Sequence, residues 1–187
     1  KAAAVIGSHQ GRLEAVTGRL EARLLGFERL VPPSVERKIG GQKGAVCWWV
    51  DDVQFDEEAR ADSKATGPDT AAWSREVQRM RLFTELTGDS DRNMGNILIT
   101  KDWRIVLIDF TRAFRLTKHV REPARVRQVE AGALDRLRSL TNDEVEARLG
   151  PWLSGPEVRA LMARRDALVA HFEAQIAQRG EASVLLR

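Results

Sequence analysis

The chain has little cysteine, no long apolar run and no basic tract, and each of these absences excludes a class of protein. Cys47 is the only cysteine among 187 residues, so there is no disulfide framework, and its apolar surroundings favour a buried structural thiol. The longest continuous apolar stretch, residues 45–50, is far too short to cross a bilayer, and no signal-peptide pattern opens the chain. We therefore expect a cytoplasmic protein without a transmembrane segment.

Charge and histidine content exclude two further classes. The 30 basic and 27 acidic residues give a net charge of +3, and no basic run is long enough to form a nucleic-acid-binding arm. His9, His119 and His171 are scattered and have no cysteine or carboxylate at ligand spacing, which argues against a zinc site. The hydrophobic content of 43% fits a globular protein with one core or two small lobes.

Two short apolar runs in the middle of the chain predict a β-hairpin. They cover residues 97–99 and 105–108, and residues 101–102 form a plausible turn between them. Asn96 precedes the first run and Asp109 follows the second. Because a hairpin returns the chain to its starting end, we expect these two side chains to lie close together.

These residue types, in this order, are the parts of a phosphoryl-transfer site. Asp91 precedes Asn96 by five residues and supplies a carboxylate that can orient or deprotonate an attacking hydroxyl. An amide oxygen from Asn96 and a carboxylate from Asp109 are suitable ligands for magnesium ions that bridge phosphates. The sequence thus predicts Asp91 as the base, with Asn96 and Asp109 as the metal ligands.

A purely structural interpretation of the same residues stays open at this point. Residues 91–93 could cap a turn, because Asp and Asn side chains readily bond to nearby backbone amides. Asp109 could be a strand-end carboxylate that pairs with Arg112 or Arg115. The ordered set with both apolar runs favours the phosphoryl-transfer interpretation.

The motifs resemble those of a known superfamily. Residues 91–96 read Asp-Arg-Asn-Met-Gly-Asn and residues 108–110 read Ile-Asp-Phe. They are similar to the catalytic motifs of protein-kinase-like enzymes of the atypical branches: phosphatidylinositol kinases, HipA-like bacterial kinases and secreted FAM20-like kinases. Residues 109–114 also resemble uncharacterised bacterial kinase-like proteins, which favours a bacterial source. The resemblance implies ATP and Mg²⁺, or Mn²⁺, as cofactors, and Arg92 as a catalytic residue beside Asp91.

Periodicity on the N-terminal side of the motifs predicts a small α+β unit. Apolar residues spaced by three and four predict a helix over residues 13–24. Strand-like runs at 34–39 and 44–50, joined by a glycine-containing turn, predict a hairpin. Residues 56–69 are polar and contain Gly67-Pro68, so we expect a loop or linker there.

Periodicity also predicts helices before and after the motifs. Apolar residues from Trp73 to Phe83 mark one helix, and those at 126–140 mark another. Capping-box patterns at Thr141 and Ser154 each predict a helix start, the second leading into a long helix. The expected fold is α+β and kinase-like. Its expected parts are a partial N-lobe at 1–52, a hinge or linker at 53–70 and a mostly helical C-lobe at 71–187.

The resemblance also implies residues that contact the nucleotide. Lys1 would hold the phosphates, with Glu14 or Glu21 as its partner, and the base would stack near Val50 at the hinge. No glycine-rich loop precedes Lys1, and Gly40-Gly41 lies in the wrong order to cover phosphates.

Two functional hypotheses follow. The first is an ATP- and Mg-dependent phosphotransferase whose acceptor hydroxyl belongs to a protein, a lipid head group or a small molecule. The second is a pseudokinase or non-catalytic binding module with the same fold. The complete set of Asp91, Asn96 and Asp109 favours the first, whereas the missing glycine-rich loop favours the second.

Overall fold

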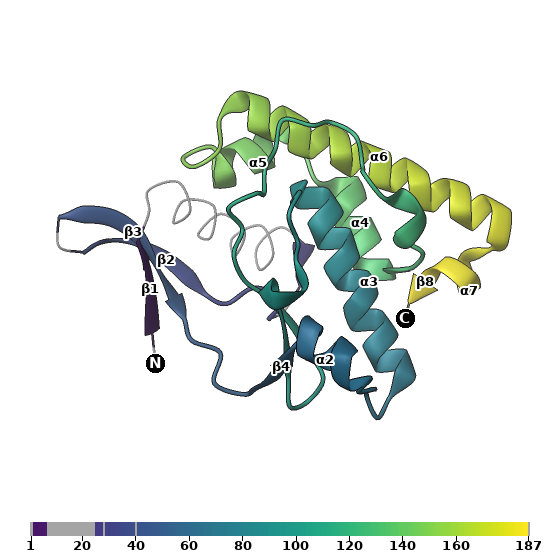
Figure 1. Ribbon diagram of the computed structural model, residues 1–187. Coiled ribbons are helices and arrows are strands. Elements are labelled where there is room, and N and C mark those ends of the chain that lie inside the picture. Colours follow the sequence, from purple (N-terminus) through teal and green to yellow (C-terminus); the bar gives the residue numbers. More distant parts are fainter. Residues whose placement is uncertain (1, 7–24, 28, 40, 187) are drawn as a thin grey trace.

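Two three-stranded antiparallel sheets, a two-stranded parallel sheet and a group of helices make up the fold (Figure 1). The structure is a computed structural model that describes residues 2–6, 25–27, 29–39 and 41–186. The strands are β1 (Ala2–Ile6), β2 (Ser34–Ile39), β3 (Gln42–Trp48), β4 (Val53–Asp56), β5 (Ile97–Thr100), β6 (Ile105–Leu107), β7 (Val129–Glu130) and β8 (Leu185–Leu186). The α-helices are α2 (Glu57–Ser63), α3 (Thr70–Thr87), α4 (Ala131–Ser139), α5 (Asn142–Leu149), α6 (Gly155–Arg179) and α7 (Glu181–Val184), and short 3-10 turns are η2 (Met94–Asn96) and η3 (Pro123–Arg125).

The first sheet has the strand order β1-β3-β2 and lies to one side of the helices in Figure 1. The pairing of Ile39 with Gln42 leaves a two-residue turn, in which Gly41 has φ 85°, as a tight hairpin requires. The predicted hairpin is therefore confirmed. Cys47 was expected to be buried but is only half-buried. The next residue of β3, Trp48, is 62% exposed. The predicted helix over residues 13–24 lies outside the described residues.

Residues 56–69, which we expected to form a loop or linker, contain the end of strand β4 and helix α2. Asp56 ends β4 and caps α2, its carboxylate accepting the backbone N–H of Ala59 at 2.8 Å. Lys64 ends the helix in the left-handed conformation, with φ 54°. No residue of α2 is buried, so the helix has no apolar stripe by which the sequence could have revealed it.

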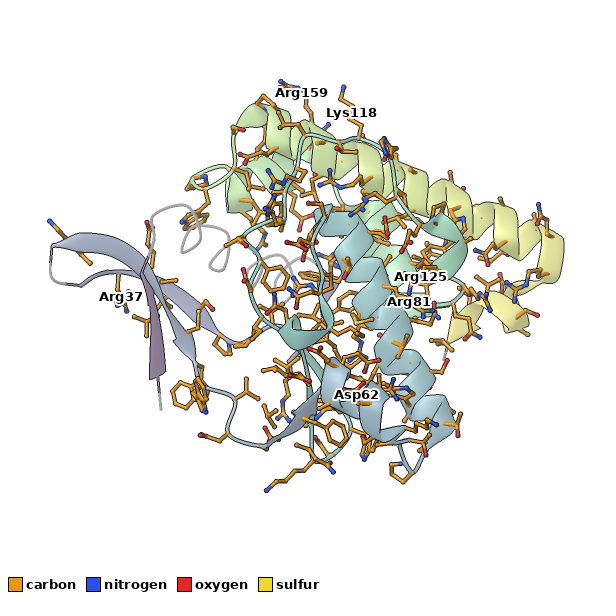
Figure 2. All side chains as sticks on the ribbon, in the orientation of Figure 1. Arg37, Asp62, Arg81, Lys118, Arg125 and Arg159 are labelled. Atoms are coloured by element: carbon orange, nitrogen blue, oxygen red, sulfur yellow. The ribbon has the colours of Figure 1, made fainter. Side chains whose placement is uncertain are left out.

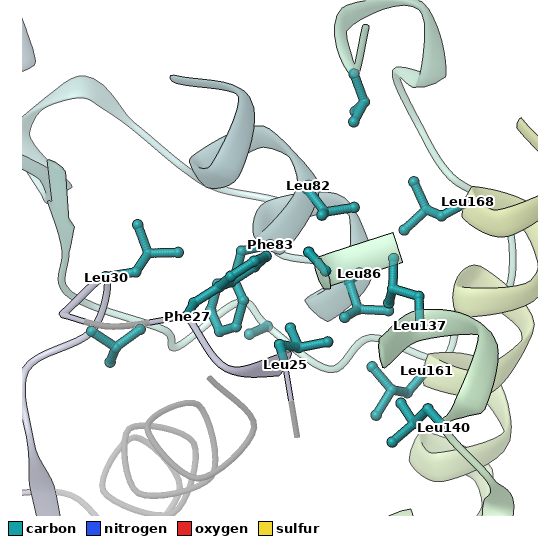
Figure 3. Packing of buried hydrophobic residues seen from close by; sticks show 14 of the residues in the cluster. Leu25, Phe27, Leu30, Leu82, Phe83, Leu86, Leu137, Leu140, Leu161 and Leu168 are labelled. Carbon is teal, nitrogen blue, oxygen red and sulfur yellow. The ribbon is translucent and has the colours of Figure 1, made fainter. Parts of the chain in front are cut away.

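The predicted helix around Trp73 to Phe83 is confirmed as α3 and forms the floor of the core. It starts after the Asp69 cap and ends at Gly88, which has φ 63°. Phe83 is fully buried and packs edge-to-face on Phe27, with ring centroids 6.4 Å apart (Figure 3). This packing joins the segment before β2 to the helical part of the molecule.

The C-terminal helices complete the core with one change from expectation. The helix predicted from residue 126 begins at Ala131, because Val129 and Glu130 form β7 and pair with β8 instead. The caps at Thr141 and Ser154 start α5 and α6 as predicted. The expected face of α6 is buried at Val158, Leu161, Leu168 and Phe172. Among the described helices, none is long and apolar enough to cross a membrane.

Candidate active site

The central hairpin brings Asn96 and Asp109 to one end of the second sheet. Strands β5 and β6 pair with Ile97 opposite Leu107, and the chain turns at residues 101–102 as predicted. The hairpin is anchored because Ile97, Ile99, Ile105 and Leu107 are buried. Beyond the last strand pair, the backbone N–H of Ile108 donates to the carbonyl of Asn96 at 3.1 Å. This bond holds together the backbones that carry the two candidate metal ligands.

The loop that precedes the hairpin is built around a buried ion pair. Asp89 and Arg92 form this pair, with only 1% and 7% of their side chains exposed. Asp89 also accepts the backbone N–H of Asp91 at 3.3 Å, which shapes the loop between them. The backbone N–H of Ser90 donates to the carbonyl of Arg112 at 3.3 Å, so the loop is tied to the segment that follows Asp109.

Arg92 connects this loop to the far end of the hairpin. Its guanidinium donates to the carbonyls of Ile108, of Asn96 at 3.3 Å and of Asp109 at 3.3 Å. It also lies over the ring of Phe110, with 4.4 Å between the guanidinium carbon and the ring centroid. Its terminal nitrogens are engaged by these backbone groups and by Asp89, so in this geometry Arg92 positions the site rather than reaching a substrate.

Asp91 has the opposite environment. Its side chain is 61% exposed, and its nearest ionic partner is Arg112, whose Nε lies 3.9 Å from Oδ2. A pair so long and so open to water restrains the carboxylate only weakly. The carboxylate is therefore accessible to an incoming hydroxyl, as its predicted role requires.

Asp109 is held by its own turn rather than by an arginine. Its φ of 56° is left-handed, a conformation that Asp and Asn tolerate better than other side chains. Its Oδ1 accepts from the backbone N–H of Thr111 at 3.2 Å and from the Thr111 hydroxyl at 2.8 Å. Among the described residues no hydrogen bond reaches Oδ2, and neither Arg112 nor Arg115 pairs with Asp109. The turn-cap interpretation holds for Asn93, whose side chain accepts from the backbone N–H of Asn96 at 3.1 Å.

The donor set fits a magnesium ion. Asp109 offers a carboxylate and Asn96 an amide oxygen, which are hard ligands of the kind that Mg²⁺ prefers. Mg²⁺ commonly binds through one or two protein groups, and it completes its shell with water and substrate phosphates. Two protein ligands are thus sufficient for a nucleotide-bound ion.

Sequence reasoning missed a buried arginine that joins α6 to the end of α3 and to the segment after Phe114. Arg164 of α6 is 1% exposed and donates to the carbonyls of Leu86 and Arg115, each at 2.9 Å, and of Thr117. Burial lowers its pKa to about 10, so it remains a cation at neutral pH. Gly88 leaves room for it, since a Cβ there would lie 2.7 Å from its guanidinium carbon. Its partners are tens of residues away in sequence, so no local pattern could have indicated it.

Four residues implied by the family resemblance have a different status. Lys1 and Glu14 lie outside the described residues, as does Glu21. Val50 is half-buried in the connection between β3 and β4, directly after the exposed Trp49. The nucleotide-binding roles of all these residues stay predictions.

Solved structures of kinases share this fold. The structure of hydra Fam20 with sugar has a TM-score of 0.68 and 14% sequence identity, covering 97% of this chain and 77% of that chain. The Golgi casein kinase has a TM-score of 0.64 and 14% identity, covering 97% of this chain and 64% of that chain. No protein-family model and no curated protein matches the sequence. The chain therefore has an α+β kinase-like fold, whereas the bacterial source and the link to the other atypical branches stay predictions.

Proposed function

We propose that this chain is an ATP- and Mg²⁺-dependent phosphotransferase. The observation that carries the proposal is the arrangement of Asp91, Asn96 and Asp109. Asn96 and Asp109 lie at the same end of one hairpin, and the accessible carboxylate of Asp91 lies on the loop that Arg92 ties to it. The kinase-like fold supports the same conclusion.

Each residue has one role in the proposed reaction. Asn96 and Asp109 would hold Mg²⁺, or Mn²⁺ in its place, which would supply neutralisation of the charge on the ATP phosphates. Asp91 accepts the proton of the acceptor hydroxyl while that oxygen bonds to the terminal phosphorus and the bond to ADP breaks. Arg92 fixes the positions of the loop and of Asp109. The acceptor could be a protein, a lipid head group or a small molecule, and we propose the cytoplasm as the place of action.

The metal assignment is tested by the substitution Asp109→Ala. Removal of a ligand leaves the phosphates unneutralised, so we expect Mg-ATP binding to be lost while the chain stays folded. Calorimetric titration of Mg-ATP measures the binding, and circular dichroism checks the fold. Asp62→Ala is the matched control, because Asp62 is an exposed carboxylate on α2 and is not a candidate metal ligand (Figure 2).

Removal of the metal gives a second, independent test. We expect EDTA to abolish ATP binding in the wild-type chain, because the charge of the ATP phosphates needs the neutralisation that the metal supplies. ATP binding that survives both EDTA and Asp109→Ala would contradict the metal assignment. Tight Mg-ATP binding without ADP release in the presence of any acceptor tested would instead favour the pseudokinase.

A further inference from the structure

A cavity of about 550 Å³ opens beside the candidate catalytic loop. Its floor is α3, and its other walls are α2, the loop that contains Ser90 and Arg92, and the segment 121–126. Ser90 and Arg92 are the two neighbours of Asp91 in the chain, and Asp91 itself does not line the cavity. The volume lies in the range of pockets for small molecules, which is roughly 300–1,000 Å³.

The acidic side chains of the cavity wall all have partners. Glu57 pairs with Arg60 at 2.6 Å, Asp89 pairs with Arg92, and Glu122 pairs with Arg125 at 2.7 Å. Glu85 accepts the backbone N–H groups of residues 121 and 122, at 2.7 and 3.3 Å. These four carboxylates use three of the five arginines that line the cavity.

The two remaining arginines are Arg81 and Arg121. Neither forms an ion pair with a carboxylate among the described residues. Arg81 donates from Nη1 to the carbonyl of Arg125 at 3.1 Å, and Figure 2 shows these two side chains close together. Its Nε is buried without a hydrogen-bond partner in the described part of the chain, and so is the hydroxyl of Thr84, three residues further along α3. Polar groups that are buried in this way commonly mark a site that a ligand or water completes.

The charge around Arg81 agrees with an anion site. Burial lowers the pKa of Arg81, and the nearby guanidinium groups of Arg125 and Arg127 lower it further, against a smaller opposing effect of Glu122. Positive groups that are crowded together and only partly balanced attract an anion of matching size.

We propose that this cavity binds a small hydroxyl compound that carries one phosphate or carboxylate group, with Arg81 and Arg121 holding the anion. The compound would be the acceptor of the proposed phosphotransferase, so this role rests on the proposed function, whereas the binding itself does not. A planar guanidinium suits both anions, since each offers paired oxygens. The size of the cavity favours a small molecule over an extended protein segment.

The experiment compares three hydroxyl compounds of similar size by calorimetry without nucleotide: glycerol 3-phosphate, glycerate and glycerol. We expect at least one of the two anions to bind and neutral glycerol not to bind; the comparison of the anions identifies the preferred group. Arg81→Gln and Arg121→Gln each remove one charge, and each should weaken anion binding roughly ten- to hundredfold. Arg159→Gln, an exposed arginine on α6, is the control and should leave binding unchanged (Figure 2).

Two outcomes would overturn the proposal: no binding of either anion, or equal anion binding by wild type and both Gln variants. ADP release is then measured with Mg-ATP and the same compounds. Arg81-dependent binding without ADP release would contradict the proposed function and leave the anion site standing. ADP release through hydrolysis of ATP, without binding of either anion, would contradict the anion site but not the phosphotransferase.

Discussion

The inner and outer sides of the loop at residues 88–96 carry similar side chains in opposite environments. On the inner side, Asp89 and Arg92 are almost fully buried, and they bond to each other and to backbone groups. On the outer side, Asp91 is 61% exposed and has only one distant partner, Arg112. The comparison teaches that two aspartates separated by one residue can serve stability and chemistry separately.

The physical reason is the cost of desolvation. A buried carboxylate must be fully paired, so Asp89 is committed to the fold and cannot act on a substrate. An exposed carboxylate keeps its hydration and its freedom to accept a proton, but it contributes little to stability. Substitutions on the inner side should therefore lower the free energy of unfolding, and substitutions of Asp91 on the outer side should lower turnover.

The largest expected effect is on the inner side. Arg92→Ala leaves Asp89 buried and unpaired and frees the carbonyls of Ile108 and Asp109. We expect a loss of about 3–5 kcal/mol in the free energy of unfolding, measured by urea denaturation. Arg112→Ala, on the exposed side, should cost less than about 1 kcal/mol. Equal losses for the two variants would break the distinction between the sides.

The substitution Asp91→Asn tests the outer side. We expect turnover to fall by about a hundred- to ten-thousand-fold, because the amide cannot accept the hydroxyl proton. The free energy of unfolding should change by less than about 0.5 kcal/mol, because the side chain is exposed. Phosphoryl transfer and melting are measured on the same preparation. Unchanged turnover would contradict the role of Asp91 as the base and leave it only a structural role in the turn.

A smaller effect is expected where the two sides meet. Thr111→Val removes the hydroxyl that donates to Oδ1 of Asp109 at 2.8 Å and leaves the shape of the side chain nearly unchanged. The loss of one such bond is worth about 1 kcal/mol, so Mg-ATP affinity should fall about fivefold. Thr117→Val, an exposed threonine, is the control. An unchanged affinity would mean that the turn backbone alone orients Asp109.

The smallest effect is expected at the turn of the hairpin, far from the site. The Thr100 hydroxyl, and after it Arg104, hold the pKa of Asp102 below its usual value. A lowered pKa in the folded state stabilises the fold above the ordinary pKa of Asp, near about pH 4, and this contribution is lost as pH falls through the folded-state value. Wild type should exceed Asp102→Asn in stability at neutral pH by less than about 1 kcal/mol, and the difference should vanish in acid. A difference that grew in acid would contradict this sign.

Helices and strands that are marked by an apolar period or a capping box were predictable from the sequence, and helix α2, which has neither, was not. The hairpin of β5 and β6, helix α3 and the caps of α5 and α6 follow from apolar spacing and from Thr141 and Ser154. Helix α2 has no buried face, so its cap at Asp56 was the only signal. The Asp89–Arg92 pair has the three-residue spacing of a local contact, and that spacing could have revealed it.

The sequence by itself determined which residues are candidates for the site and in what order they come, because hairpin geometry brings the two ends of a short segment together. Only the tertiary structure decided which side of the loop each residue faces. Arg92, implied by family resemblance to be catalytic, has a buried guanidinium, and Arg164 joins α6 to backbone groups far away in the chain. Burial depends on what packs against a residue from distant segments, and no local pattern of residue types contains that information.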